Sequence, residues 1–200
     1  MKQIVFRMTG VNEMLMHNGR LVDSLDPFAK WMKEVSGKRK KTDDDHQLMA
    51  EIEFYGGLYT RPAMRDRKDI AVPVQFILPR EVIWGCIYAG AKLSKDGQEC
   101  KKAVLVEEHA ILKGLEKFKT ASDLLADGRF FDRRRVRLGG KTGIMRTRPI
   151  FAGWSCEVAV TYEPEKANQE DVARWMSEAG AWVGIGDYRP TYGRFEVEVV

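Results

Sequence analysis

The stretch WVGIGDYRPTYGRFEVEVV, from Trp182 to Val200, decides how the fold of this chain is interpreted. Three glycines enclose a short loop that carries charged and aromatic side chains, between an expected helix and an expected final strand. Glycine tolerates positive φ and lets another backbone segment approach closely. We therefore expect the glycines to form the scaffold of the loop, namely Gly184, Gly186 and Gly193. The side chains expected to face a ligand are Tyr188, Arg189, Tyr192 and Arg194; a tight helix-to-strand connection is the alternative.

Composition is consistent with a packed protein of 200 residues, of which 44% are hydrophobic. The 33 basic and 29 acidic side chains give a net charge of +4, which permits a nucleic-acid partner but does not require one. Three widely spaced cysteines without a CxxC pair argue against a disulfide scaffold or a zinc knuckle. Free thiols, a polar N-terminus and the lack of an apolar run of about 18 residues predict a cytoplasmic protein away from membranes.

Hydrophobic periodicity and capping residues predict the order of the elements. A first strand at 2–9 precedes two helices, the first capped by Asp26 and the second by Thr42. Further along we expect a strand at 70–78, a helix at 80–93 and a strand at 103–106. A strand at 154–162 leads to a helix capped by Asn168, and the last strand turns Phe195, Val197 and Val199 inward. The tryptophans are expected in the core: Trp31, Trp84, Trp154, Trp175 and Trp182.

This order contains strand–helix–strand twice, which predicts an α+β fold. The expected architecture is a ferredoxin-like (RRM-like) βαββαβ core in a single domain, residues 1–200. Two segments interrupt the core. The pair of helices forms a helical insertion at about 24–60, and a basic β-hairpin is inserted at about 129–150.

The most basic segment, 129–148, carries eight Lys or Arg residues and one acidic residue. Alternation of arginine with apolar residues around a glycine-rich centre predicts a β-hairpin with a basic face. Cations neutralise phosphates and release counterions, so this face is a candidate nucleic-acid site. Its expected contacts are Arg133, Arg134, Arg135, Arg137, Lys141, Arg146 and Arg148. Pairing of these arginines with the protein's own carboxylates is the alternative, and for Phe130 and Phe131 core packing is favoured over base stacking.

The pattern Gly-x-Gly-x-x-Arg-x-x-x-Gly-Arg before the last strand resembles the glycine-rich loop of the RAMP superfamily, the RNA-binding backbone and repeat-processing subunits of CRISPR effector complexes. The matching residues are Gly184, Gly186, Arg189, Gly193 and Arg194. The resemblance implies that the loop packs at an RNA-binding face and that an inserted hairpin acts as a thumb on the bound strand. Residues 15–30 also resemble uncharacterised phage and prophage proteins, which implies a phage-encoded member.

Catalytic residues are not expected, although His17, beside Asn18 and Arg20, is a weak candidate for metal-independent RNA cleavage. The segment 43–45 is interpreted as a helix cap because three consecutive helical aspartates cannot converge on one metal. Neither a metal nor a cofactor is expected. The expected partner is single-stranded nucleic acid, RNA in preference to DNA, with self-assembly or other ribonucleoprotein subunits. The alternatives are an endoribonuclease of the same fold and a phage factor that acts on a host protein complex.

Overall fold

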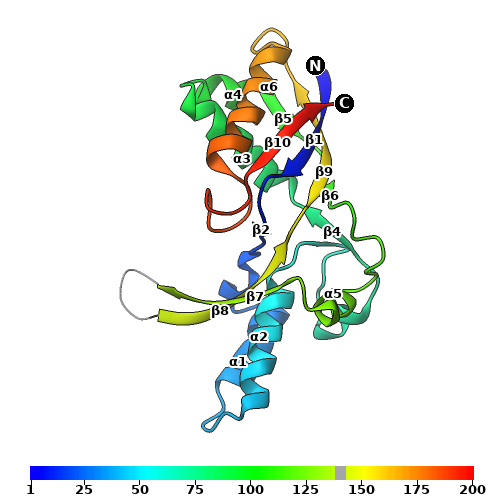
Figure 1. Ribbon diagram of the computed structural model, residues 1–200, viewed down its shortest axis with the longest axis vertical. Helices are drawn as coiled ribbons and strands as arrows, with labels where there is room; N and C mark the ends of the chain where they lie inside the picture. Colours follow the sequence, from blue (N-terminus) through cyan, green and yellow to red (C-terminus); the bar gives the residue numbers. More distant parts are fainter. Residues whose placement is uncertain (138–142) are drawn as a thin grey trace. The chain divides into compact units, whose positions relative to one another are not determined.

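The computed structural model describes residues 1–137 and 143–200 (Figure 1). The α+β prediction is confirmed: six α-helices and several antiparallel sheets are present among these residues. The chain divides into two compact units. Unit 1 consists of Met1–Leu15, Phe76–Leu115 and Phe151–Val200; unit 2 consists of Met16–Gln75 and Glu116–Ile150.

Unit 1 is built around a four-stranded antiparallel sheet in the order β10-β1-β9-β5. These strands span Phe195–Val199, Lys2–Gly10, Ser155–Tyr162 and Val104–Val106. Unit 1 also contains the short strands β2 (Met14–Leu15) and β6 (Ala110–Ile111) and all of β4 (Gln75–Leu78) except Gln75; these strands belong to other sheets. In the central pairing Phe6 lies opposite Val158 on one side and Val199 on the other.

One face of this sheet is covered by helices α3 (Arg80–Leu93) and α6 (Gln169–Glu178). Alternate residues of β1, namely Ile4, Phe6 and Met8, are buried on that face. The two helices meet at Gly90, where an added Cβ would lie 2.3 Å from the carbonyl oxygen of Trp175. A side chain at this position would therefore push the helices apart. The helix α4 (Gly97–Ala103) and the π-helix η3 (Ala179–Val183) complete the unit.

Unit 2 contains a helical hairpin of α1 (Pro27–Ser36) and α2 (Asp43–Gly57). Asp26 accepts a hydrogen bond from Phe28 N, and Thr42 with Asp45 forms a capping box, so both predicted helix starts are confirmed. The unit also contains the β-hairpin of β7 (Phe131–Arg137) and β8 (Gly143–Phe151) and the helix α5 (Ala121–Asp127). Its remaining elements are the 3₁₀ segments Gly19–Val22 and Arg67–Ala71 and the strand β3 (Thr60–Arg61).

Three sequence-based expectations about elements or burial are wrong. The strand expected at 70–78 begins only at Gln75, because Asp66 and Asp69 cap a 3₁₀ turn and Pro73 has no N–H for a ladder. Val199, at the end of the edge strand β10, is 49% exposed. Trp182 is 72% exposed.

Among the described residues, no helix combines the length and the apolar character that crossing a membrane requires.

Candidate nucleic-acid interface

The glycine-rich loop of unit 1 has a backbone that only glycine fits at three positions. Gly184, Gly186 and Gly193 have φ values of 75°, 86° and 75°. An added Cβ at Gly193 would lie 1.7 Å from Ile185 O, and one at Gly186 would lie 2.4 Å from Leu15 O. The glycines therefore serve as scaffold, as the sequence indicated, because another backbone segment occupies the space of a side chain.

Backbone hydrogen bonds tie this loop to the segment that follows β1. Ile185 N donates to Gly193 O at 2.8 Å, and Gly193 N donates to Glu13 O at 2.8 Å. Asp187 N donates to Leu15 O at 2.8 Å. The side chain of Asn12 adds two bonds, donating to Thr191 O and accepting from Arg194 N, both at 2.8 Å. The loop is thus held in one conformation before any ligand arrives.

The predicted contact side chains of the loop differ in how free they are. Tyr188 is 60% exposed and has a φ of 56°, which is uncommon for a residue other than glycine. Its ring lies 6.0 Å from that of the half-buried Tyr192. Arg189 is exposed, whereas Arg194 donates from Nε to Ala181 O at 3.0 Å. Tyr188 and Arg189 are therefore the most accessible members of the set.

Trp182 adds an exposed aromatic ring that sequence reasoning assigned to the core. The expectation assumed an α-helix that continues past Ala179, which would have turned Trp182 inward. The chain instead winds as a π-helix from Ala179 to Val183, so the angular position of each side chain shifts. Hydrophobic periodicity gives no signal for this change. Within the π-helix, Gly180 packs on β10, where an added Cβ would lie 2.2 Å from Phe195 O.

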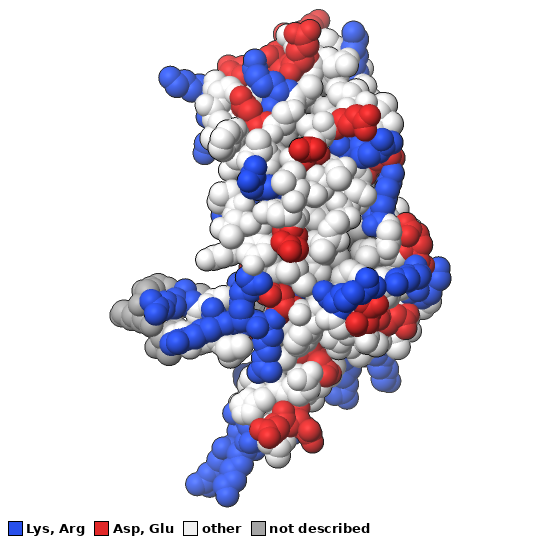
Figure 2. Space-filling view, in the orientation of Figure 1, with Lys and Arg blue, Asp and Glu red and all other residues white. Residues whose placement is uncertain are grey.

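The basic hairpin of unit 2 presents three arginines for which the described residues provide no carboxylate partner. Arg133, Arg135 and Arg137 alternate along β7 and are all exposed. Among the described residues, no carboxylate lies within ion-pair distance of these three guanidinium groups. Because side chains alternate across a strand, the three project from the same side of β7. Figure 2 shows the concentration of Lys and Arg on this hairpin.

Two other arginines of the hairpin are engaged within the protein. Arg134 pairs with Asp132, donating from Nε to Oδ2 at 2.7 Å. Arg146, which lies opposite Arg134 in the ladder, donates from Nη1 to Glu53 Oε1 of α2 at 2.6 Å. These carboxylates relieve the repulsion between directly opposed like charges. Arg148 is half-buried, and Lys141 lies outside the described residues.

The two phenylalanines beside the hairpin pack inside unit 2, as favoured from the sequence. Phe130 is 9% exposed, and its ring lies 5.1 Å from that of Phe118 in an edge-on arrangement. The ring of Phe131 lies 6.0 Å from that of Phe54 on α2. Phe130 is buried and Phe131 is half-buried, and both rings anchor the hairpin to its unit.

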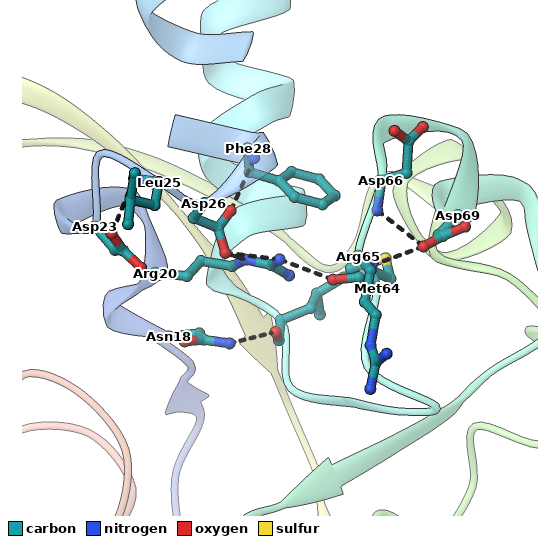
Figure 3. Close-up of polar contacts among 11 residues, drawn as sticks. Asn18, Arg20, Asp23, Leu25, Asp26, Phe28, Met64, Arg65, Asp66 and Asp69 are labelled. Carbon is teal, nitrogen blue, oxygen red and sulfur yellow. Dashed lines mark hydrogen bonds and ion pairs between the residues drawn. The ribbon is translucent and has the colours of Figure 1, made fainter. Parts of the chain in front are cut away.

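The surroundings of His17 are structural (Figure 3). His17 is exposed, but its neighbour Asn18 donates to Leu58 O at 3.3 Å. Arg20 donates to Asp26 Oδ2 at 2.9 Å and to Met64 O at 2.7 Å. Its guanidinium carbon lies 4.4 Å from the centre of the Phe28 ring. Asn18 and Arg20 therefore hold the loop against the helical hairpin and are not available to assist cleavage by His17.

The other histidines show no catalytic arrangement. His46 is exposed on α2, and Nδ1 of the half-buried His109 accepts from Arg80 N at 3.1 Å. In the described part of the chain, no group of three His, Cys, Asp or Glu side chains is arranged to hold a metal ion. All three cysteines are buried, and burial raises the pKa of each thiol to about 12. These thiols are therefore protonated and poor nucleophiles.

A pocket of about 450 Å³ opens between α2 and α5 in unit 2. Its polar lining comes from Gln47, Glu51, Tyr55 and Ser122, and burial raises the pKa of Tyr55. The lining contains neither histidine nor cysteine. The hydroxyl of Ser122 donates a hydrogen bond to Ile70 O at 2.9 Å.

The uncovered face of the unit 1 sheet is polar and charge-balanced. Arg7 on β1 lies opposite Glu157 and Glu198, with N···O distances of 3.3 and 2.9 Å. Lys113 pairs with Glu157 at 2.5 Å, and these contacts hold the pKa of the Glu157 carboxyl below its ordinary value. No aromatic ring stands between these charges on β1, β9 and β10. This face therefore differs from the aromatic sheet surface with which RRM domains stack bases.

Comparison with known proteins adds no assignment: no protein-family model matches the chain, and no curated protein matches it.

Proposed function

We propose that this protein binds single-stranded nucleic acid, RNA in preference to DNA, without catalysing a reaction. The basic hairpin and the side chains of the glycine-rich loop are the two contact surfaces. The loop belongs to unit 1 and the hairpin to unit 2.

The observation that carries the proposal is the row of three exposed arginines, Arg133, Arg135 and Arg137, without carboxylate partners among the described residues. Successive members of the row lie about 6.8 Å apart along an antiparallel strand. Phosphates recur at regular intervals along a nucleic-acid strand, so a row of cations on one side of a β-strand can contact more than one of them. The neighbouring Arg134 is neutralised by Asp132 on the other side of the strand. The hairpin therefore concentrates its free charge on one side.

Exposed aromatic rings near the glycine-rich loop favour an unpaired strand over a duplex. Trp182 and Tyr188 are 72% and 60% exposed, and Arg189 beside them is exposed. Bases of a single strand stack on such rings, at about 1–3 kcal/mol per base and without a sequence requirement. Paired bases in a duplex hide their faces from such stacking. The π-helix and the positive φ of Tyr188 place strained backbone at this point, as functional sites often do.

We infer that unit 1 is a ferredoxin-like core in which α3 connects β1 to β5 and α6 connects β9 to β10. The sheet order β10-β1-β9-β5 and the helices on one face support this inference. With the glycine-rich loop before β10, it also supports the proposed relationship to the RAMP superfamily and the preference for RNA. The protein would then act as a subunit of a ribonucleoprotein or CRISPR-like complex, or as a phage nucleic-acid binder.

The test uses protein that has been freed of nucleic acid by nuclease and high salt, checked by the ratio of absorbance at 260 and 280 nm. Fluorescence anisotropy with labelled 20-nucleotide RNA, DNA of the same sequence and duplex DNA measures the three affinities at 50 mM salt. We expect the RNA strand to bind tightest and to remain uncut. Absence of binding to both single strands refutes the proposal. Loss of full-length RNA would instead indicate an endoribonuclease, and a protein that copurifies after nuclease treatment would indicate an interaction factor.

A further inference from the structure

We propose that the tip of the α1–α2 hairpin in unit 2, residues 37–42, is a second phosphate-binding site for the same strand. Arg39 and Lys40 are its contacts. This inference rests on the proposed function, because it concerns the same single-stranded ligand. The tip and the basic hairpin are separate elements of unit 2, so the tip would be an additional site.

The turn at this tip is held in shape by its own neighbours. Gly37 N donates to Lys33 O at 2.9 Å, and Lys41 Nζ donates to Lys38 O at 3.0 Å. Lys38 Nζ donates to Asp45 Oδ1 at 2.5 Å. Two of the four consecutive cations, Lys38 and Lys41, are therefore used to fix the turn.

The other two cations are left free by this arrangement. Arg39 and Lys40 are exposed, and within the described ranges neither side chain makes an ion pair or a hydrogen bond. Figure 2 shows their end of the helical hairpin as a dense group of Lys and Arg. Because the turn is already ordered, a phosphate contact there costs little further backbone entropy.

The acidic residues that follow do not cancel these two charges. Asp45 is engaged by Lys38 and by the capping box, which lowers the pKa of its carboxyl. Asp43 and Asp44 stand in the first turn of α2, where the positive end of the helix dipole, about half a unit charge, offsets part of their negative charge. Arg39 and Lys40 therefore keep part of their positive charge for an anionic ligand at the end of the hairpin.

The length of α2 sets the distance between the tip and the basic hairpin. Phe54 of α2 packs against Phe131, where β7 begins, and lies 12 residues after Thr42. At about 1.5 Å per residue, this separates the tip from the foot of the basic hairpin by about 18 Å. That distance corresponds to roughly five nucleotides of a stacked strand. A strand must therefore extend beyond the hairpin before it reaches the tip.

The experiment compares the wild type with the double variant Arg39→Gln/Lys40→Gln. Each phosphate contact on a single strand contributes about 0.7 to the slope of log K against log salt. For a 20-nucleotide RNA we expect the variant to have a slope less steep than that of the wild type by about 1.4. Its affinity at 0.1 M salt should be lower by roughly tenfold. For a hexamer, which is too short to contact the whole row of three arginines and the tip together, we expect less than a twofold change in affinity. The control Lys101→Gln/Lys102→Gln removes the same charge from exposed positions of α4. It should change neither the slope nor the affinity for either RNA.

The outcomes separate the two proposals. Unchanged slope and affinity of the tip variant on the 20-nucleotide RNA, with binding by the wild type intact, overturn the tip site alone. If the tip variant loses as much affinity for the hexamer as for the 20-nucleotide RNA, the spacing argument is overturned. The idea that one strand contacts both the basic hairpin and the tip is then overturned too. If the wild type binds no single strand, the proposed function fails first and the tip site fails with it.

Discussion

Replacing Gly193 with alanine tests whether close backbone approach fixes the glycine-rich loop. The φ of 75° costs a non-glycine residue about 1–2 kcal/mol. The new Cβ would stand 1.7 Å from Ile185 O, so the backbone must move. That movement weakens the bonds of Gly193 to Ile185 and to Glu13, each worth about 0.5–1.5 kcal/mol. We expect Gly193→Ala to lower the free energy of unfolding by about 2–4 kcal/mol, and the melting temperature by roughly 5–15 °C.

Two matched variants in unit 1 separate the cost of positive φ from the cost of the close backbone contact. Stability is measured by urea unfolding, monitored by tryptophan fluorescence. Gly153 has a φ of 60° and open space around its Cβ position, so Gly153→Ala should cost only the backbone term of about 1–2 kcal/mol. Gly85 lies in α3 without positive φ and without a neighbour within 4 Å, so Gly85→Ala should stabilise by about 0.5–1 kcal/mol. If Gly193→Ala costs no more than Gly153→Ala, the argument from close approach is refuted.

Two further predictions concern the buried thiols and the foot of the basic hairpin. At pH 8 a thiol reagent should leave Cys86 and Cys156 unmodified in the native protein and should modify them in urea. The reason is that burial raises the pKa of both thiols to about 12. Rapid modification of the native protein would contradict this prediction. Glu53→Ala should lower the free energy of unfolding by about 1–3 kcal/mol, because Thr147 N loses its 2.7 Å acceptor. Glu53→Gln keeps an acceptor there and should cost less than about 1 kcal/mol, since Arg146 is partly exposed; equal costs in urea titrations would show that the acceptor is unimportant.

Local signals in the sequence predicted much of the secondary structure. The caps Asp26, Thr42 and Asn168 each bond a nearby backbone N–H, so residues within three positions determine these helix starts. The π-helix at Ala179–Val183 was not predictable from periodicity, because the pattern of apolar residues presumed an α-helix. Its cause is tertiary, since Gly180 packs on the backbone of Phe195. The exposure of Trp182 follows from that contact and not from its neighbours in sequence.

The candidate interface was predictable as a segment, but not residue by residue. Charge and alternation located the basic hairpin, which spans 131–151 in the structure. Alternation also places Asp132 and Arg134 on one side of β7, so their pairing had a signal in the sequence. The pairing of Arg146 with Glu53 joins residues far apart in the chain, and only the fold reveals it. The set of free arginines is therefore smaller than the basic run suggested.

The measurement that tests the central claim most directly is the salt dependence of single-stranded RNA binding by Arg133→Gln/Arg135→Gln/Arg137→Gln. With about 0.7 per phosphate contact, the slope of log K against log salt should be less steep than that of the wild type by about 2. The control Lys95→Gln/Lys101→Gln/Lys102→Gln removes equal charge from exposed positions of unit 1 and should keep the wild-type slope. A hairpin variant that keeps the wild-type slope and affinity would contradict the account.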